Sequence, residues 1–358
     1  MIKVLIVEDS PVLQELLSFI LKSDPEINII GIAKDGEEAI DFVKNHKPDV
    51  ITMDIHMPLL NGIEATRRIM QTMPVPIIIV SSTINTMENS NSFKAMEAGA
   101  LALLPKPMSV GHPEFTSTAN GLITTVKLMS EIKVVKRWAN KSVYNHDILN
   151  NNIQSVPTGQ SRQVNEDFQI IAVGASTGGP LVIKSILSNL KPGFPLPILI
   201  VQHIACGFLQ GFADWLGDAI ALPLHVARHQ ELILPGHVYI APDYMHMGVD
   251  SSHRIVLSNE APVNGLRPSV GKLFESVFEV YGKGAIGVLL TGMGKDGAEE
   301  MKRLHDHGAL TIAQDEESSV VHGMPGSAIA LNGVSHILSP AKIPEMLNKL
   351  TYSKTQQW

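Results

Sequence analysis

Cysteine is almost missing from this chain of 358 residues, in which Cys206 is the single example. One thiol cannot form an internal disulfide, so the fold must depend on packed cores, and the composition suits a reducing compartment. Long hydrophobic runs are missing too, because no apolar segment reaches the roughly 20 residues that cross a bilayer. The apolar run of residues 2–7 meets acidic residues too soon for a secretory signal. We expect a cytoplasmic protein without membrane insertion.

An excess of basic charge is also missing. The chain has 28 Lys and Arg residues against 35 Asp and Glu residues, which gives a formal net charge of −7. This balance argues against nucleic acid as a partner. Hydrophobic residues make up 44% and charged residues 18% of the chain, a composition that supports packed globular cores. At roughly 150 residues per domain, the length predicts two domains.

The first part of the chain alternates between short apolar runs and amphipathic segments. Strands are predicted at residues 3–7, 27–33, 50–53, 77–80 and 101–104. Ser10 is expected to cap the first helix ahead of Pro11, and a fifth helix is expected between residues 113 and 135. Near-continuous apolar strands that alternate with helices indicate a parallel sheet covered on both faces. The pattern predicts a flavodoxin-like α/β domain over residues 1–125, with a five-stranded parallel sheet.

A stretch rich in Asn, Ser and Gln follows at residues 140–167, and its composition is typical of an exposed linker. After it the alternation returns and predicts a second, doubly wound α/β domain. Its strand candidates are residues 170–173, 197–201, 238–241, 255–257, 285–290 and 310–313. Its helix candidates are residues 181–190, 208–222, 270–281, 298–307 and 342–350. The expected boundaries are 126–167 for the helix end and linker, 168–350 for the second domain and 351–358 for a polar tail.

Polar side chains follow the predicted strands of the first domain. Glu8 and Asp9 follow the first strand and Asp54 the third, and in flavodoxin-like order these strands are neighbours at the switch point where ligands bind. Three carboxylates in one crevice favour a bound cation, and such an oxygen-rich site suits Mg²⁺. Ser81 and Lys106 follow the fourth and fifth strands. A single acid at a strand end is usually a solvated loop residue, but this agreement of five residues across four strands favours a site that accepts a phosphoryl group.

These residues lie in sequence motifs, which are VEDS (7–10), MDIHMP (53–58), VSS (80–82) and PKP (105–107). With them the first domain resembles response-regulator receiver domains. The resemblance implies that Asp54 is phosphorylated by a histidine kinase, that Glu8, Asp9 and Asp54 hold Mg²⁺, and that Ser81 and Lys106 form the phosphorylation switch. Leu103 is a departure, because receivers usually carry an aromatic residue at this position.

Residues 174–178 of the second domain, GASTG, match the G-x-S-x-G pattern of a serine nucleophile. The same residues could be a helix-capping turn, while a nucleotide cradle is disfavoured because the G-x-G-x-x-G spacing and a Walker lysine are missing. A serine needs a base and an orienting acid at the same sheet edge. His203 follows the next predicted strand, and Asp296 follows a strand through a glycine-rich turn.

Other assignments remain open at this stage. Asp243 and Asp315 also follow strands and compete with Asp296, while Cys206 is a weaker candidate nucleophile. The chain order Ser–His–Asp differs from that of α/β-hydrolases, so the motif does not imply that fold. Thr177 and the turn formed by Gly292 and Met293 are candidates for stabilising or positioning an oxyanion.

The second domain resembles the catalytic domain of the chemotaxis protein-glutamate methylesterase family, CheB. The matching runs are VGASTGGP (173–180), VQHIACGF (201–208), PGHVYIAP (235–242), RPSV (267–270), LLTGMGKDGA (289–298) and AQDEESSVVHGMP (313–325). The resemblance implies a triad of Ser176, His203 and Asp296. Residues 204–206 lack the two prolines that the family has after the histidine.

The resemblance implies a phosphorylation-activated serine hydrolase that acts in chemotactic adaptation. Its substrates would be glutamate γ-methyl esters on the cytoplasmic domains of chemoreceptors, and it would also deamidate glutamines. The phosphodonor would be the chemotaxis histidine kinase, and the esterase chemistry would need no cofactor. An alternative is a non-catalytic regulator whose docking depends on phosphorylation.

Overall fold

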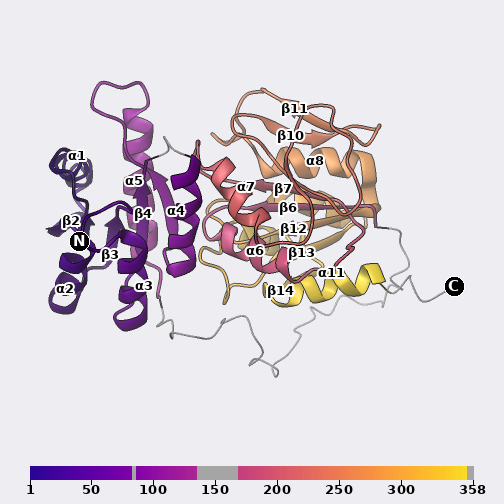
Figure 1. Cartoon of the computed structure of the whole chain (residues 1–358). Helices are drawn as coiled ribbons and strands as arrows, with labels where there is room; N and C mark the ends of the chain where they lie inside the picture. Colours follow the sequence, from indigo (N-terminus) through magenta and orange to yellow (C-terminus); the bar gives the residue numbers. More distant parts are fainter. Residues whose placement is uncertain (83–85, 135–167, 353–358) are drawn as a thin grey trace. The chain divides into compact units, whose positions relative to one another are not determined.

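The computed structural model describes residues 1–82, 86–134 and 168–352, which fold into two compact α/β units (Figure 1). The predicted linker at residues 140–167 lies outside the described residues. The predicted polar tail also lies outside them, apart from Thr351 and Tyr352. Among the described helices, none has both the length and the apolar character that a membrane crossing requires.

The first unit is built on a five-stranded sheet with the order β2-β1-β3-β4-β5, in which all neighbours pair in parallel. The strands are β1 (Ile2–Val7), β2 (Ile27–Ala33), β3 (Val50–Met53), β4 (Ile77–Ser81) and β5 (Ala102–Pro105). The helices are α1 (Pro11–Lys22), α2 (Gly36–His46), α3 (Gly62–Thr72), α4 (Thr86–Ala98) and α5 (Phe115–Ser130). The flavodoxin-like fold that the sequence predicts is therefore confirmed.

Helix starts in this unit depend on local side-chain chemistry. Asp35 caps α2 by accepting hydrogen bonds from the amides of Glu37 and Glu38. Ser10 occupies the cap position of α1 as expected, but its side chain makes no capping hydrogen bond. Its amide instead donates to Glu8 Oε1 at 3.2 Å, so this hydrogen bond holds the Glu8 side chain against the turn after β1.

The second unit has a seven-stranded parallel sheet with the order β14-β13-β12-β6-β7-β9-β8. Its strands are β6 (Ile170–Ala175), β7 (Ile198–Gln202), β8 (Leu224–Val226), β9 (Val238–Ile240), β12 (Ala285–Leu289), β13 (Leu310–Gln314) and β14 (His336–Leu338). The predicted strand at residues 255–257 is β11 (Ile255–Ser258), which pairs antiparallel with β10 (His246–Val249) in a separate hairpin. Helix α8 packs against this hairpin and also against the main sheet (Figure 1).

The helices of the second unit cover both faces of its main sheet. They are α6 (Gly179–Ser188), α7 (Leu209–Gly217), α8 (Val270–Tyr281), α9 (Ala298–Asp306), α10 (Met324–Ala330) and α11 (Lys342–Tyr352), with a 3₁₀ turn at Gly282–Gly284. Ile170 and Ala172 of β6 pack in the core formed with α8, α9 and α10. The alternate residues Ile171 and Val173 line the opposite core beside α6 and α11. This alternation explains why β6 is apolar throughout, as a doubly wound sheet requires.

Candidate active site and phosphoacceptor site

The ends of β6 and β7 place Ser176 and His203 next to each other. The two strands pair in register up to Ala175 and Gln202, so Ser176 and His203 are the next residues at the same sheet edge. The amide of His203 donates to the carbonyl oxygen of Ala175 at 2.9 Å, which extends the pairing by one residue. The carboxyl ends of parallel strands are where such sheets bind ligands. The predicted nucleophile and base are therefore brought together.

The end of β12 packs directly against Ser176. The Ser176 amide donates to the carbonyl oxygen of Thr291 at 3.0 Å. A Cβ atom on Gly292 would lie 2.7 Å from the Ser176 Cβ, so only glycine permits this approach. The Gly292 amide donates to the Val321 carbonyl oxygen at 2.9 Å and is thus committed within the fold. Gly292 therefore contributes by allowing the turn after β12 to lie close to Ser176.

The third predicted residue reaches His203 from the turn after β12. Asp296 Oδ2 lies 3.0 Å from His203 Nε2, and the two side chains are only 5% and 12% exposed. The distance suits a hydrogen bond, but the N–H direction is not aligned with a partner in this ring orientation. A rotation of the imidazole is needed to align the bond, and such loose geometry is common before substrate binds.

Asp296 is held at the N-terminus of α8. Its Oδ1 accepts hydrogen bonds from Ser269 Oγ at 2.8 Å and from the Gly271 amide at 3.1 Å, while Oδ2 accepts from the Val270 amide at 2.7 Å. Burial would raise the pKa of Asp296, but the pairing with His203 and these hydrogen bonds outweigh burial and lower the pKa. The side chain is therefore an oriented, ionised carboxylate.

Two residues that support Asp296 were not predicted from the sequence. Ser269 occupies the cap position of α8 without capping it, because its hydroxyl donates to Asp296 instead. His246 is 3% exposed and accepts the Ser269 amide hydrogen at Nδ1 over 3.2 Å. Its Nε2 lies 3.2 Å from the Ala261 carbonyl oxygen, which requires the hydrogen on Nε2. A serine just before an amphipathic helix was the available signal, but it indicates a helix cap rather than a partner for a carboxylate.

One competing candidate, Asp315, lies away from His203. Asp315 follows β13, which is separated from β7 by β12 and β6, and its Oδ1 accepts the Ser318 amide hydrogen at 3.1 Å. Cys206 is exposed. Met293 is 47% exposed in the turn between β12 and Asp296, and the Thr177 carbonyl accepts a hydrogen bond from Thr291 Oγ1 at 3.0 Å. Thr177 and Met293 thus both lie on turns that border Ser176 and Asp296.

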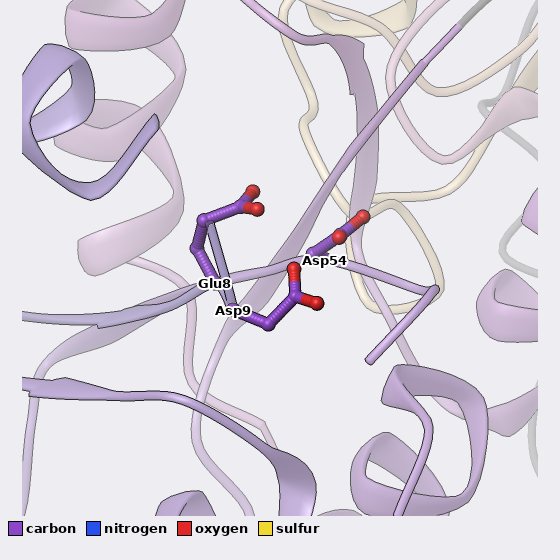
Figure 2. Close-up of side chains that lie close together, drawn as sticks. All are labelled: Glu8, Asp9 and Asp54. Carbon is purple, nitrogen blue, oxygen red and sulfur yellow. The ribbon is translucent and has the colours of Figure 1, made fainter. Parts of the chain in front are cut away.

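The first unit brings together its three predicted acids. Glu8 and Asp9 follow β1, Asp54 follows β3, and their carboxylate oxygens lie within 4.8 Å of one another (Figure 2). Burial and the negative charge of Asp54 raise the pKa of Glu8, although Lys106 opposes this. A compact group of oxygen ligands whose charges repel fits a hard divalent cation such as Mg²⁺.

Lys106 and Ser81 complete this edge of the sheet. Lys106 Nζ lies 2.9 Å from Glu8 Oε2 and 3.0 Å from Asp54 Oδ2. Burial would lower the pKa of Lys106, but the two carboxylates outweigh burial and raise it, so the ammonium stays charged. Ser81 is 1% exposed, and its hydroxyl has no hydrogen-bond partner within the described residues. A buried hydroxyl without a partner is unusual and is available to hydrogen-bond a ligand.

Several known proteins resemble this chain over nearly its full length. The family model described as "CheB methylesterase" matches residues 171–347, and the response regulator receiver domain model matches residues 4–112. A protein-glutamate methylesterase/protein-glutamine glutaminase of Nitrosospira multiformis is 52% identical over 353 residues, which cover 98% of this chain and 97% of that protein. The chain belongs to this family.

Two further relatives carry the same description. The one from Syntrophus aciditrophicus is 51% identical over 99% of both chains, and the one from Methanospirillum hungatei is 43% identical over 98% of this chain and 99% of its own. The chain is thus a receiver-linked member of the CheB methylesterase and glutaminase family, which acts in chemotactic adaptation. The family, the fold class and the type of enzyme predicted from the sequence are confirmed, and the non-catalytic docking regulator is not supported.

Proposed function

We propose that Ser176, His203 and Asp296 form the catalytic triad that hydrolyses glutamate γ-methyl esters on chemoreceptor cytoplasmic domains. The observation that carries this proposal is the convergence of all three residues at one sheet edge, with His203 Nε2 3.0 Å from Asp296 Oδ2. The printed descriptions of the relatives support both methyl-ester hydrolysis and glutamine deamidation. An ester and an amide pass through similar tetrahedral intermediates, so one site serves both reactions.

The proposed reaction has two halves. Ser176 Oγ attacks the ester carbonyl carbon while His203 takes the hydroxyl proton, and a tetrahedral oxyanion forms. The turns that carry Thr177 and Met293 would stabilise this oxyanion, and Gly292 would position them. The intermediate collapses as His203 protonates the leaving methoxide, which departs as methanol. Water activated by His203 then attacks the acyl-serine, which regenerates Ser176 and leaves a free glutamate.

Asp296 would act through His203. The transition state places a positive charge on the imidazole, and an ionised carboxylate 3.0 Å away stabilises that charge. The three hydrogen bonds from Ser269, Val270 and Gly271 keep the carboxylate fixed, so it reorganises little during the reaction.

The receiver would regulate this chemistry. Asp54 would accept a phosphoryl group from a chemotaxis histidine kinase, and Lys106 and Ser81 would contact the phosphoryl oxygens. Glu8, Asp9 and Asp54 would hold Mg²⁺, which when bound neutralises negative charge at the phosphoryl group. Phosphorylation would then raise the rate of ester hydrolysis, for which no metal is required.

The proposed domains are a receiver at residues 1–125, a helix end and linker at 126–167, the esterase domain at 168–350 and a tail at 351–358, of which the first two residues continue helix α11. The proposed location is the cytoplasm, without membrane insertion or nucleic-acid binding, in keeping with the net charge of −7.

The direct test measures methanol release from membranes that contain methylated receptors. The full chain should release methanol, a phosphodonor should increase the rate, and Ser176→Ala should release none. Release that persists in folded Ser176→Ala protein would contradict the nucleophile assignment.

A further inference from the structure

Gln202, the last residue of β7, joins the two residues proposed as nucleophile and base. The side chain is buried, with 4% of the residue exposed. Its Nε2 donates to the carbonyl oxygen of Ser176 at 2.9 Å and to the carbonyl oxygen of His203 at 2.7 Å. Two carbonyl oxygens can only be paired with the NH₂ group, so their chemistry fixes the orientation of the amide.

We propose that Gln202 is a positioning residue that sets the separation of Ser176 and His203, an inference that rests on the proposed function. The regular pairing of β6 with β7 ends at Ala175 and Gln202, and one further backbone bond joins His203 to Ala175. Beyond that bond the chain after Ser176 enters α6, and the chain after His203 enters a loop. The Gln202 amide connects the two segments where the ladder has ended.

The amide oxygen of Gln202 explains why residue 179, in the run Ser176-Thr177-Gly178-Gly179, is a glycine. A Cβ atom on Gly179, the first residue of α6, would lie 2.2 Å from Gln202 Oε1. That space is therefore reserved for the amide oxygen, and the positive end of the α6 dipole is a favourable neighbour for it. Gly178 is required for a different reason, because its φ of +80° is in the left-handed region.

Burying the Gln202 amide lowers the stability of the fold, which would not be expected if the side chain served only to fill space. Gln202 Oε1 is buried without a hydrogen-bond partner within the described residues. An unsatisfied buried oxygen destabilises the fold, and an apolar side chain of the same length would avoid that cost. Exceptions to the rule that buried polar atoms are hydrogen-bonded occur mainly at functional sites. This supports a role for Gln202 in holding the catalytic geometry.

The test compares Gln202→Met, which keeps the length but has no donor, with Gln202→Glu in the full chain. For Gln202→Met, kcat on methylated receptor membranes should fall about a hundredfold, because small misplacements of reacting groups cost that much. The KM should change less than twofold, since the receptor surface is untouched. The control is Leu347→Ala in α11, a buried substitution (Leu347 is 2% exposed) that lowers thermal stability through the core beside β6 and leaves Ser176, His203 and Gln202 unchanged.

The Gln202→Glu variant adds a pH readout that loss of stability would not produce. A buried carboxylate that faces two carbonyl oxygens has a raised pKa, and only its protonated form can donate a hydrogen bond. His203, which follows this position in the chain, and Asp296, which lies 3.0 Å from His203, are the same in all variants. The kcat ratio of Gln202→Glu to the parent should therefore rise as the pH falls, while the ratio for Gln202→Met stays flat.

The outcomes separate this inference from the proposed function. If the parent protein releases no methanol, the proposed function is contradicted and this inference with it. If the parent is active and Gln202→Met keeps parental kcat, or loses no more than Leu347→Ala, the inference alone is overturned. A kcat ratio of Gln202→Glu to the parent that does not change with pH also overturns the inference. This second readout still decides the matter if Gln202→Met does not fold.

Discussion

Replacing Asp296 by asparagine exchanges one carboxylate oxygen for an NH₂ group, and the hydrogen bonds at this side chain determine which one. With the amide oxygen at the Oδ2 position, the hydrogen bond from the Val270 amide is kept, and this oxygen still faces His203 Nε2 at 3.0 Å. The NH₂ group then faces Ser269 Oγ, which can accept, and the Gly271 amide, which cannot. The opposite orientation loses the shortest bond, at 2.7 Å from Val270. We expect the first orientation, in which the His203 tautomer is preserved.

Asp296→Asn therefore removes the negative charge beside His203 while the position of the side chain is kept. At the 3.0 Å separation of Asp296 Oδ2 and His203 Nε2, an imidazolium and a carboxylate attract by about 5.5 kcal/mol at an effective dielectric constant of ~20. The amide dipole retains part of this, so we expect a loss of ~4 kcal/mol in transition-state stabilisation, or about a thousandfold in kcat. The free energy of unfolding should fall by ~1–3 kcal/mol, because the Gly271 amide faces another donor.

The effect on stability should depend on pH with a definite sign. The pKa of Asp296 is lowered in the folded protein, so its carboxylate stabilises the fold above the unfolded pKa. That contribution is lost as the pH falls through the folded pKa. The difference in stability between the parent and Asp296→Asn should therefore be largest near neutral pH and should shrink in acid.

The assay is methanol release under saturating substrate, with denaturant unfolding of the same preparations followed by circular dichroism. Asp306→Asn is the matched control, because Asp306 is the last residue of α9 and its side chain is half exposed beside Lys302. A folded Asp296→Asn protein with kcat within threefold of the parent would refute the reasoning, because the negative charge would then contribute nothing to the transition state.

The remaining predictions concern the nucleophile, the support of Asp296 and the receiver. Ser176→Ala should abolish methanol release while its unfolding midpoint stays within a few degrees of the parent, and residual turnover would argue for another nucleophile. Ser269→Ala should lower kcat about tenfold, because one of several charge-assisted hydrogen bonds to Asp296 is lost. Ser269→Thr keeps a hydroxyl and should restore most of the parental kcat. Equal rates for the two variants would contradict a role for the Ser269 hydroxyl. Asp54→Asn should prevent both phosphorylation and the rise in esterase rate, as should removal of Mg²⁺ by a chelator, which should leave the basal rate unchanged. We infer that the unphosphorylated receiver inhibits the esterase domain, so deleting residues 1–150 should raise basal methanol release. A truncated protein no faster than the unphosphorylated full chain would contradict this inhibition.

The sequence was most informative where apolar strands end in polar residues. Ser176, His203 and Asp54 each follow a buried strand, and parallel pairing brings such positions to one edge whatever the loop details. The grouping of Glu8 and Asp9 with Asp54 also needed the flavodoxin-like strand order, which makes the first and third strands neighbours.

Other features have no signal in local patterns. The strands β8 and β14 have three residues each at the sheet edges, with too little apolar alternation to stand out. Helix α10 has seven residues and begins Met-Pro-Gly, a sequence more typical of a turn. Ser269, His246 and Gln202 act through contacts between segments far apart in the chain, as in the hydrogen bond from Ser269 to Asp296 across 27 positions. Such contacts depend on tertiary packing and cannot be derived from spacing.

The most direct test of the central claim measures methanol released from methylated receptor membranes by the full chain, before and after phosphorylation. The proposed function predicts release that increases on phosphorylation, is lost in Ser176→Ala, and no longer responds to phosphodonor in Asp54→Asn. An absence of methanol from the folded, phosphorylated parent, or unchanged release by Ser176→Ala, would contradict it.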